Sequence, residues 1–429
     1  MTMKKILSMT LALLLVLGLT ACGIEQTAHE QTTDDGEQTI TFWYMDKKLM
    51  TDPLEKRVAE FNKLYEGKYN LVYEWIPRGN AYAYEDKVNT AASANMLPDI
   101  LALDGPNLAN YVSNGLLIPL DDYVTAESKA DMMPSLLVQN TYEGKLYAIG
   151  LNEATCGLFY NKDIFEANGF RIPTSIDDAY TWSEIYEMAK KVSTPEVVGI
   201  KLILDKGEGI PYVFSSFWVG NGSAFTSEDG SKCNGYINNA KGVETATYLQ
   251  RFFNEKLANI DPTPTEFQDG KAAMWLANIA EIAGIEKNYP DLNWGVTYMP
   301  KPDNGVMAAP CGSWTVGITR DCKDPEAAFV ALDFLTNSES TRVYMDESGF
   351  PGARISNYQD NKKWDSEPLN AFKTQLFEAA VPRPRTPVYT VLSPKFSETM
   401  LDIFTGSDPK ESLDALAEFV DAQYVKATK

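Results

Sequence analysis

The sequence is poor in histidine, in basic residues and in long hydrophobic runs. Its single histidine, His29, lies in a polar stretch near the N-terminus, so the remainder of the chain contains none. A body without histidine excludes histidine-based catalytic triads, histidine-ligated zinc and imidazole general bases. Catalysis by carboxylates alone stays possible, and we expect neither a metal nor a cofactor.

Basic residues are outnumbered by acidic ones, 38 to 59, which gives a formal net charge of −21. Removing residues 1–21 takes away Lys4 and Lys5 and no acid, which leaves 36 basic residues against 59 acidic ones and a charge of −23. Such a surface repels nucleic acid, and no basic cluster offsets it. We therefore expect no nucleic-acid partner, and an anionic solute would need a local basic pocket.

Cysteine is also sparse, and beyond residue 22 it occurs only at Cys156, Cys233, Cys311 and Cys322. No CxxC pair or dense disulfide framework is present. Cys311 and Cys322 flank an apparent strand, "GSWTVGIT". Eight extended residues span roughly 26 Å, whereas a disulfide needs Cα atoms about 4.4–6.8 Å apart. These two cysteines should not pair with each other.

The one long apolar run, Ile6 to Leu19, follows Lys4 and Lys5. It is too short for a comfortable transmembrane helix and suits a secretory signal. The sequence Leu-Thr-Ala-Cys that ends at Cys22 resembles the lipobox of bacterial lipoproteins, which implies cleavage after residue 21 and a diacylglycerol on the Cys22 sulfur. The alternative is an ordinary signal peptide with a chance cysteine. Residues 22–37 are polar and should form a flexible tether from the lipid anchor.

The 408 residues that follow the signal are too many for one ordinary core and predict two domains. "QTITFWYM", "YNLVYEWIP" and "MLPDILALD" read as strands, separated by helical segments. One helix, "DPLEKRVAEFNKLYEG", should begin with Asp52 as N-cap and Pro53 at its first position. This alternation predicts a doubly wound α/β fold.

The pattern restarts after about residue 150. "CGLFYNK", "VVGIKLIL" and "LNWGVTYMP" read as strands, and Thr181 with Glu184 forms a capping box before a helix. After "GSWTVGIT" we expect helices only. Ligands of open α/β sheets lie beyond the carboxyl ends of the strands, so the default site is the cleft between the two domains.

Seven segments in this order resemble one family: "LPDILALDGPNLANYVSNGLLIPLDDY", "YEGKLYAIG", "GLFYNKDIFEANG", "FQDGKAAM", "GSWTVGIT", "DPEAAFVALDFLTNSEST" and "GFPGAR". They are similar to extracellular solute-binding proteins of ABC sugar importers, the maltose- and oligosaccharide-binding group. The resemblance runs from about residue 39 to the C-terminus. It implies a monomeric binding protein, not an enzyme, that closes on a carbohydrate and docks on a permease at the extracytoplasmic face of the cell membrane.

The resemblance also implies lobes that are discontinuous in sequence and joined by a hinge. The first lobe would comprise 38–151 and 314–346, and the second 157–310 and 350–429. The hinge would lie near 152–156, 311–313 and 347–349. Because two of these segments should run side by side, a Cys156–Cys311 disulfide is conceivable, although four separate thiols are the preferred interpretation.

Sugars present apolar CH faces and hydroxyl rims, so their sites need aromatic platforms and polar side chains. On the family pattern, Asp104 contacts ligand unless it caps the next helix, and one of Tyr212 and Trp218 contacts ligand while the other is core. Arg383 and Arg385 are more readily surface charges than ligand contacts. The remaining candidates are Trp43, Glu153, Trp314 and Tyr389.

One departure from the family affects the expected ligand. Many relatives follow "FQDGKAAM" with a turn whose tryptophan stacks on sugar, whereas here Trp275 comes early and Ala280 occupies the usual place. Trp275 is therefore either a contact or a strand residue, and Asn278 and Glu281 could replace stacking by hydrogen bonds. Rival interpretations are a carboxylate-dependent glycosidase, a solute sensor that feeds a signalling receptor, and a binding protein for a polyamine or peptide.

Overall fold

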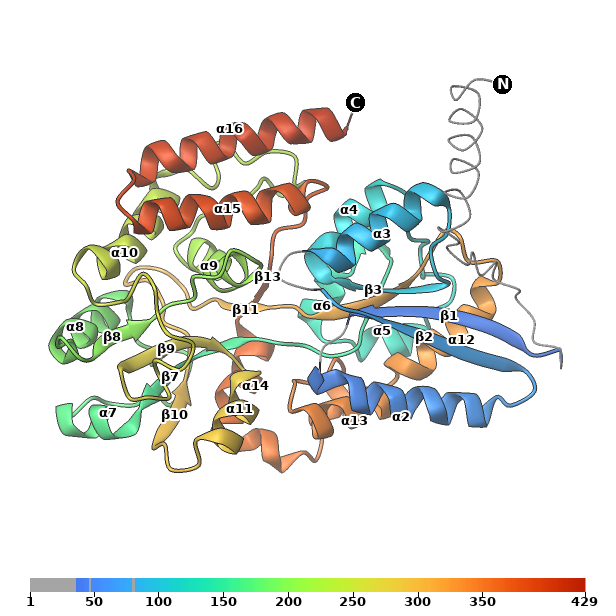
Figure 1. The fold of residues 1–429 in the computed structure, drawn as a ribbon, viewed down its shortest axis with the longest axis horizontal. Helices are drawn as coiled ribbons and strands as arrows, with labels where there is room; N and C mark the ends of the chain where they lie inside the picture. Colours follow the sequence, from blue (N-terminus) through green and yellow to red (C-terminus); the bar gives the residue numbers. More distant parts are fainter. Residues whose placement is uncertain (1–35, 46–47, 79–81, 429) are drawn as a thin grey trace, which may run out of the picture.

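The computed structural model describes residues 36–45, 48–78 and 82–428. The predicted signal peptide, Cys22 and most of the predicted tether lie outside these residues. Within the described part of the chain, no helix combines the length and the apolar character needed to cross a membrane. The fold is mixed α/β, and Figure 1 shows two lobes, one on each side of a set of crossing segments.

The first lobe is built on a five-stranded sheet in the order β2-β1-β3-β12-β6. Its strands are β1 (Gln38–Met45), β2 (Tyr69–Ile76), β3 (Ile100–Asp104), β6 (Ile149–Gly150) and β12 (Trp314–Ile318). β1 pairs in parallel with β2 and β3, as the alternating strands and helices predict. β12, from much later in the chain, pairs antiparallel with both β3 and β6.

Helices cover this sheet and connect its strands. They are α2 (Lys48–Leu64), α3 (Ala83–Ala94), the 3₁₀ turn η1 (Gly105–Asn107), α4 (Leu108–Ser113), α5 (Ala126–Ala130), α6 (Pro134–Gln139), α12 (Pro325–Thr336) and α13 (Ser338–Ser348), with a hairpin of β4 (Thr141–Tyr142) and β5 (Lys145–Leu146). The predicted start of α2 is wrong, because Pro53 lies inside the helix. Met50 and Leu54 are both buried, and this burial accompanies the extra turn before the proline.

The second lobe contains a four-stranded sheet in the order β10-β7-β9-β8. Its strands are β7 (Cys156–Asn161), β8 (Val198–Lys201), β9 (Ala272–Asn278) and β10 (Trp294–Thr297). Around it lie α7 (Lys162–Asn168), α8 (Trp182–Val192), α9 (Gly209–Gly220), α10 (Ala240–Asn254), α11 (Glu281–Asn288), α15 (Tyr389–Phe404) and α16 (Pro409–Ala427). The predicted capping box is confirmed, since Thr181 and Glu184 exchange both capping hydrogen bonds.

The expectation of helices only after β12 is wrong in one place. β13 (Ala380–Pro382) pairs in parallel with β11 (Ala309–Cys311). Along the chain, β13 follows η2 (Ile355–Tyr358), η3 (Lys362–Asp365) and α14 (Leu369–Glu378), and it precedes α15. Its three residues are too few to show the period-2 alternation that identifies a strand in a sequence.

The crossing segments run close together between the lobes, as Figure 1 shows for β11 and β13. Thr155 forms an isolated bridge with Cys311, and the Glu153 amide donates to the Pro351 carbonyl at 2.8 Å. The side-by-side course expected for the segments around residues 155 and 311 is therefore present. Cys156, Cys233, Cys311 and Cys322 are all free thiols in the structure.

Candidate functional site: a polar network between the lobes

Asp104 lies at the end of β3, where the first lobe faces the second. Its side chain does not cap the turn that follows; instead, both carboxylate oxygens accept hydrogen bonds from Arg383. The Arg383 Nη1 to Asp104 Oδ2 distance is 3.1 Å. A planar guanidinium matches a carboxylate in this two-pronged way, which fixes the orientation of both groups.

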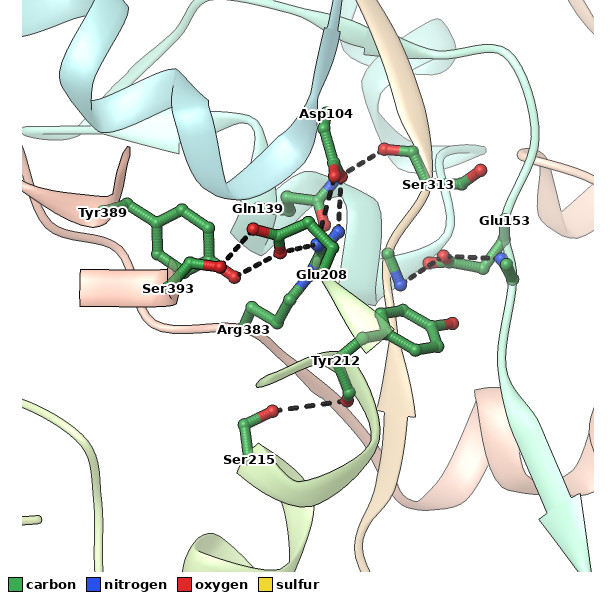
Figure 2. A network of polar contacts seen from close by, with 12 residues as sticks. Asp104, Gln139, Glu153, Glu208, Tyr212, Ser215, Ser313, Arg383, Tyr389 and Ser393 are labelled. Atoms are coloured by element: carbon green, nitrogen blue, oxygen red, sulfur yellow. Dashed lines mark hydrogen bonds and ion pairs between the residues drawn. The ribbon is translucent and has the colours of Figure 1, made fainter. Parts of the chain in front are cut away.

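Arg383 follows β13 and is the centre of the network in Figure 2. The preference for a surface charge is wrong here, because only 4% of the residue is exposed. Its Nη1 also donates to Glu208 Oε2 at 2.7 Å, so the guanidinium joins a carboxylate of each lobe. Burial opposes the charged form, but Asp104, Tyr389 and Glu208 outweigh it and hold the pKa of Arg383 well above its usual range. Arg385, in contrast, donates to the Val138 and Thr141 carbonyls.

Glu208 immediately precedes α9 and gathers hydroxyl donors from both lobes. Tyr389 donates to it at 2.7 Å and Ser393 also donates, both from α15. Tyr82, just before α3 of the first lobe, donates to Glu208 at 3.3 Å. Sequence reasoning missed Glu208, because an acid before a helix reads as an N-terminal charge. The only available signal was its position two residues before the aromatic-rich segment that starts at Ile210.

A second arginine extends the network on the side of the first lobe. Arg78 forms ion pairs with Glu85 at 2.7 Å and with Asp104 at 3.5 Å. Its guanidinium carbon also lies 5.5 Å from the ring centre of Trp314. Burial raises the pKa of Glu85, although Arg78 opposes this shift. Three carboxylates and two guanidinium groups therefore meet where the lobes touch, and all are removed at least in part from water.

Glu153 is fully buried inside the crossing segments rather than at their surface. Its Oε1 accepts from the amides of Gly312 at 2.7 Å and Ala154 at 2.9 Å, and its Oε2 accepts from the Ser135 hydroxyl at 2.6 Å. Burial raises its pKa to about 7, against the opposing effect of these donors. Gly312 has a φ of 115°, which favours glycine, and a Cβ there would meet Gln139 Oε1 at 2.2 Å.

Three predicted aromatic residues lie at or beside the network. Tyr389 donates to Glu208, and the Arg383 guanidinium carbon lies 5.1 Å from the ring centre of Tyr212. Trp314 pairs with Asp104 across β12 and β3, and its ring meets Tyr84 edge-on at 5.5 Å between centroids. All three are largely buried, with Tyr212 at 9% exposure the most accessible of them.

Three other predicted residues have no described contact with the network. Trp218 is completely buried in the second lobe, and its indole donates to the Ile237 carbonyl at 2.9 Å. Trp275 lies within β9 under the Lys201 ammonium, 4.5 Å from its ring centre. Trp43 is half-buried in β1, where Lys87 lies 4.5 Å from its ring centre. Trp218 is therefore a core residue, and ligand contact by Tyr212 stays a prediction.

Ala280, where the resemblance led us to expect a stacking tryptophan, lies at a recess. Ala280 lines a cavity of about 380 Å³ together with residues from the end of α13 and from segment 363–369. Asn278 turns back and accepts a hydrogen bond from the Ala280 amide at 2.9 Å, and Glu281 is half-buried near Lys201. Within the described chain, no cluster of three or more histidine, cysteine or acidic side chains is arranged to hold a metal.

Comparisons with known proteins agree with this architecture. The structure matches the sugar-binding protein MalE of Xanthomonas citri with a TM-score of 0.76 at 21% identity, covering 91% of this chain and 98% of that one. It also matches the ABC substrate-binding protein Lmo0181 of Listeria monocytogenes in complex with cycloalternan, with a TM-score of 0.74 at 20% identity and coverages of 90% and 98%.

A curated relative, the mannitol-binding protein of Pseudomonas aeruginosa, is 22% identical over 346 residues, which cover 76% of each chain. The family model for bacterial extracellular solute-binding proteins matches residues 47–342 of this sequence. That span exceeds half of the chain and includes strands of both sheets. The protein therefore belongs to the family of bacterial extracellular solute-binding proteins, which are binding proteins and not enzymes.

Proposed function

We propose that this protein captures a neutral sugar, most suitably an oligosaccharide, between its lobes and delivers it to an ABC importer. One observation carries the proposal. Arg383, at the crossing, is bonded to Asp104 of the first lobe and to Glu208 of the second. A solute that contacts this network contacts both lobes at once, so binding is coupled to their closure.

The chemistry of the network favours a ligand rich in hydroxyl groups. Carboxylates accept hydrogen bonds from hydroxyls, guanidinium groups donate to them, and tyrosine rings cover apolar CH faces. Asp104, Tyr212, Trp314 and Tyr389 are the predicted contacts that we retain, and we add Glu208 and Arg383. We propose that Glu153 acts indirectly, by holding the crossing segments, and that Trp43, Trp218 and Trp275 support the fold.

The names of several relatives agree with a sugar-like solute. The curated relatives include a mannitol-binding protein and a lactose-binding protein of Rhizobium radiobacter, the latter 27% identical over 295 residues. We further propose that Cys22 carries a lipid that keeps the monomeric protein at the outer face of the cell membrane, with a hinge near 152–156, 311–313 and 347–349.

A thermal-shift screen tests the proposal, with mannitol, lactose, maltotriose and mannotriose as sugars and spermidine as the cationic alternative. A ligand at 100 times its Kd adds about 2.7 kcal/mol to the free energy of unfolding. We expect stabilisation by at least one sugar, and Asp104→Asn should weaken it. Stabilisation by spermidine alone would contradict the sugar proposal, and product formation from any oligosaccharide would contradict binding without turnover.

A further inference from the structure

A groove of about 470 Å³ lies on the second lobe between α8 and α10. Figure 1 places both helices at the left of that lobe, away from the crossing segments. Its lining includes Trp182, Tyr186, Thr247, Tyr248, Arg251 and Asp303. Of these, only Asp303 comes from outside the two helices, and none belongs to the network between the lobes.

The floor of the groove is made of aromatic rings that are held in place. Trp182 and Tyr248 stack with their centroids 4.5 Å apart and an angle of 8° between their planes. The Tyr248 hydroxyl donates to the Trp182 carbonyl at 3.1 Å, and the Arg251 guanidinium carbon lies 3.8 Å from the ring centre of Tyr186. Fixed rings lower the conformational entropy that the protein loses when a ligand binds.

Trp182 also carries a hydrogen-bond donor that the described residues leave unused. Only 4% of the residue is exposed, and its indole Nε1 has no acceptor among them. The equally large Trp218, in contrast, donates to the Ile237 carbonyl. Trp364 has a buried indole without a partner as well, but that residue does not line the groove. A buried donor without a partner costs free energy, and an acceptor bound in the groove would remove this cost at Trp182.

The rim supplies hydrogen-bonding groups with little net charge. Thr247 is exposed, and its hydroxyl donates to the Val243 carbonyl at 2.7 Å, so its oxygen is left to accept a hydrogen bond from a ligand. Asp303 is exposed and forms no ion pair with the described residues. The other two charges of the rim are balanced: Glu244 pairs with Lys241 at 2.8 Å, and Arg251 with Glu255 at 3.7 Å. The rings of the floor stack mainly on one another, Trp182 on Tyr248 and on Phe217, so they meet a ligand at their edges. These edges and a nearly neutral, hydrogen-bonding rim suit a neutral, hydroxyl-rich saccharide and not a strongly charged ligand.

We infer that this groove is a second binding site for a neutral saccharide, separate from the site between the lobes. The second site does not require lobe closure, because its lining comes from one lobe. It therefore holds a saccharide whether the interlobe site is filled or not. A site of this kind would keep part of a long glycan on the protein surface.

The test is an NMR titration of the ¹⁵N-labelled full-length protein with maltotriose to about 10 mM, ten times a Kd of about 1 mM. The indole N–H signal of Trp182 is assigned by its loss in Trp182→Phe. We expect a saturable shift of this signal in the wild type and in Arg383→Met, which damages the interlobe network. Loss of one rim hydrogen bond in Thr247→Val or Asp303→Asn should raise the midpoint about 3- to 10-fold.

Asp261→Asn is the matched control, because Asp261 is exposed and does not line the groove. It should leave the midpoint unchanged. A Trp182 signal that does not move would overturn the inference, as would rim variants with the wild-type midpoint. A shift that disappears in Arg383→Met would also overturn it, because the signal would then report lobe closure. Failure of the interlobe proposal alone would leave the Trp182 shift in place.

Discussion

Replacing Arg383 by methionine should change how readily the lobes close. Methionine fills a similar volume but removes the guanidinium that bonds both Asp104 and Glu208. Removal of one partner from a buried ion pair typically costs about 3–5 kcal/mol, because the other charge stays buried and unpaired. Asp104 would keep its longer pair with Arg78 at 3.5 Å, and Glu208 would keep hydroxyl donors such as Tyr389.

Lobe opening offers these carboxylates a way to regain water, so the cost should appear in the closure equilibrium rather than in global unfolding. At the lower limit of about 3 kcal/mol, the ratio of closed to open protein falls roughly 100-fold. Small-angle scattering during titration with the sugar found in the thermal-shift screen measures this shift. The sugar concentration at half closure should rise by the same factor, and Arg383→Lys should give an intermediate value because lysine keeps the charge without the fork.

Arg171→Met is the matched control. Arg171 also contacts two carboxylates, Asp178 and Glu184, but its side chain is 42% exposed. Exposed pairs contribute about 0–1 kcal/mol, so the closure midpoint should stay at its wild-type value. If Arg383→Met closes at the same sugar concentration as the wild type, the bridging role of the guanidinium is wrong.

The remaining predictions concern the crossing segments and the anchor. Burial raises the pKa of Glu153 to about 7, so the folded protein keeps a proton that the unfolded chain loses near pH 4.3. The free energy of unfolding of the wild type should therefore fall between about pH 4.5 and 7 relative to that of Glu153→Gln, by roughly 2–3 kcal/mol in urea titrations; parallel pH profiles would contradict this. Trp314→Ala should lower the unfolding free energy by about 3–5 kcal/mol, since the ring is buried, and an unchanged melting curve would show a dispensable ring. Cys22→Ser should release the protein into the medium or leave its precursor uncleaved, and a normally processed protein that stays on the membrane would refute the anchor. Thiol titration of the denatured, unreduced protein should find free thiols at both Cys156 and Cys311, and a missing pair would indicate a disulfide.

Short sequence patterns were sufficient to predict most of the strands and helices. The strand from Ile100 to Asp104 reads from a short apolar run, and Thr181 with Glu184 reads from a capping pattern of four residues. These features depend on backbone propensity and on burial within one element, so the chain around them is enough. The start of α2 was predicted wrongly, because the burial of Met50 is a tertiary effect that local rules for helix ends do not include.

The network between the lobes could be predicted only in part, because its contacts join residues that lie far apart in the sequence. Asp104 and Tyr389 stand out by their places in the family pattern, but Arg383 reads as a surface charge because it sits in a proline-rich stretch, "VPRPRTP". Its partners lie 279 and 175 positions away in the sequence. No local pattern records such a pairing. Arg383 is buried and placed between the two carboxylates only in the folded protein, where β13 pairs with β11.

Two features bear on how this site would distinguish one sugar from another. One is Ala280, at the position where the resemblance implies a stacking tryptophan, and the other is the buried Arg383 bridge. On the resemblance, the missing ring would remove an apolar contact with the sugar, and the structure has a recess of about 380 Å³ at Ala280, beside the crossing segments. The ion pairs of Arg383 place oriented hydrogen-bonding groups where the lobes touch. Stacking tolerates many sugars, because every ring has an apolar face, whereas fixed carboxylates and a guanidinium group reject a solute whose hydroxyls do not match them. The combination favours selectivity through hydrogen bonds over affinity through stacking. The relevant discrimination should therefore be between sugars that differ in hydroxyl orientation rather than in length.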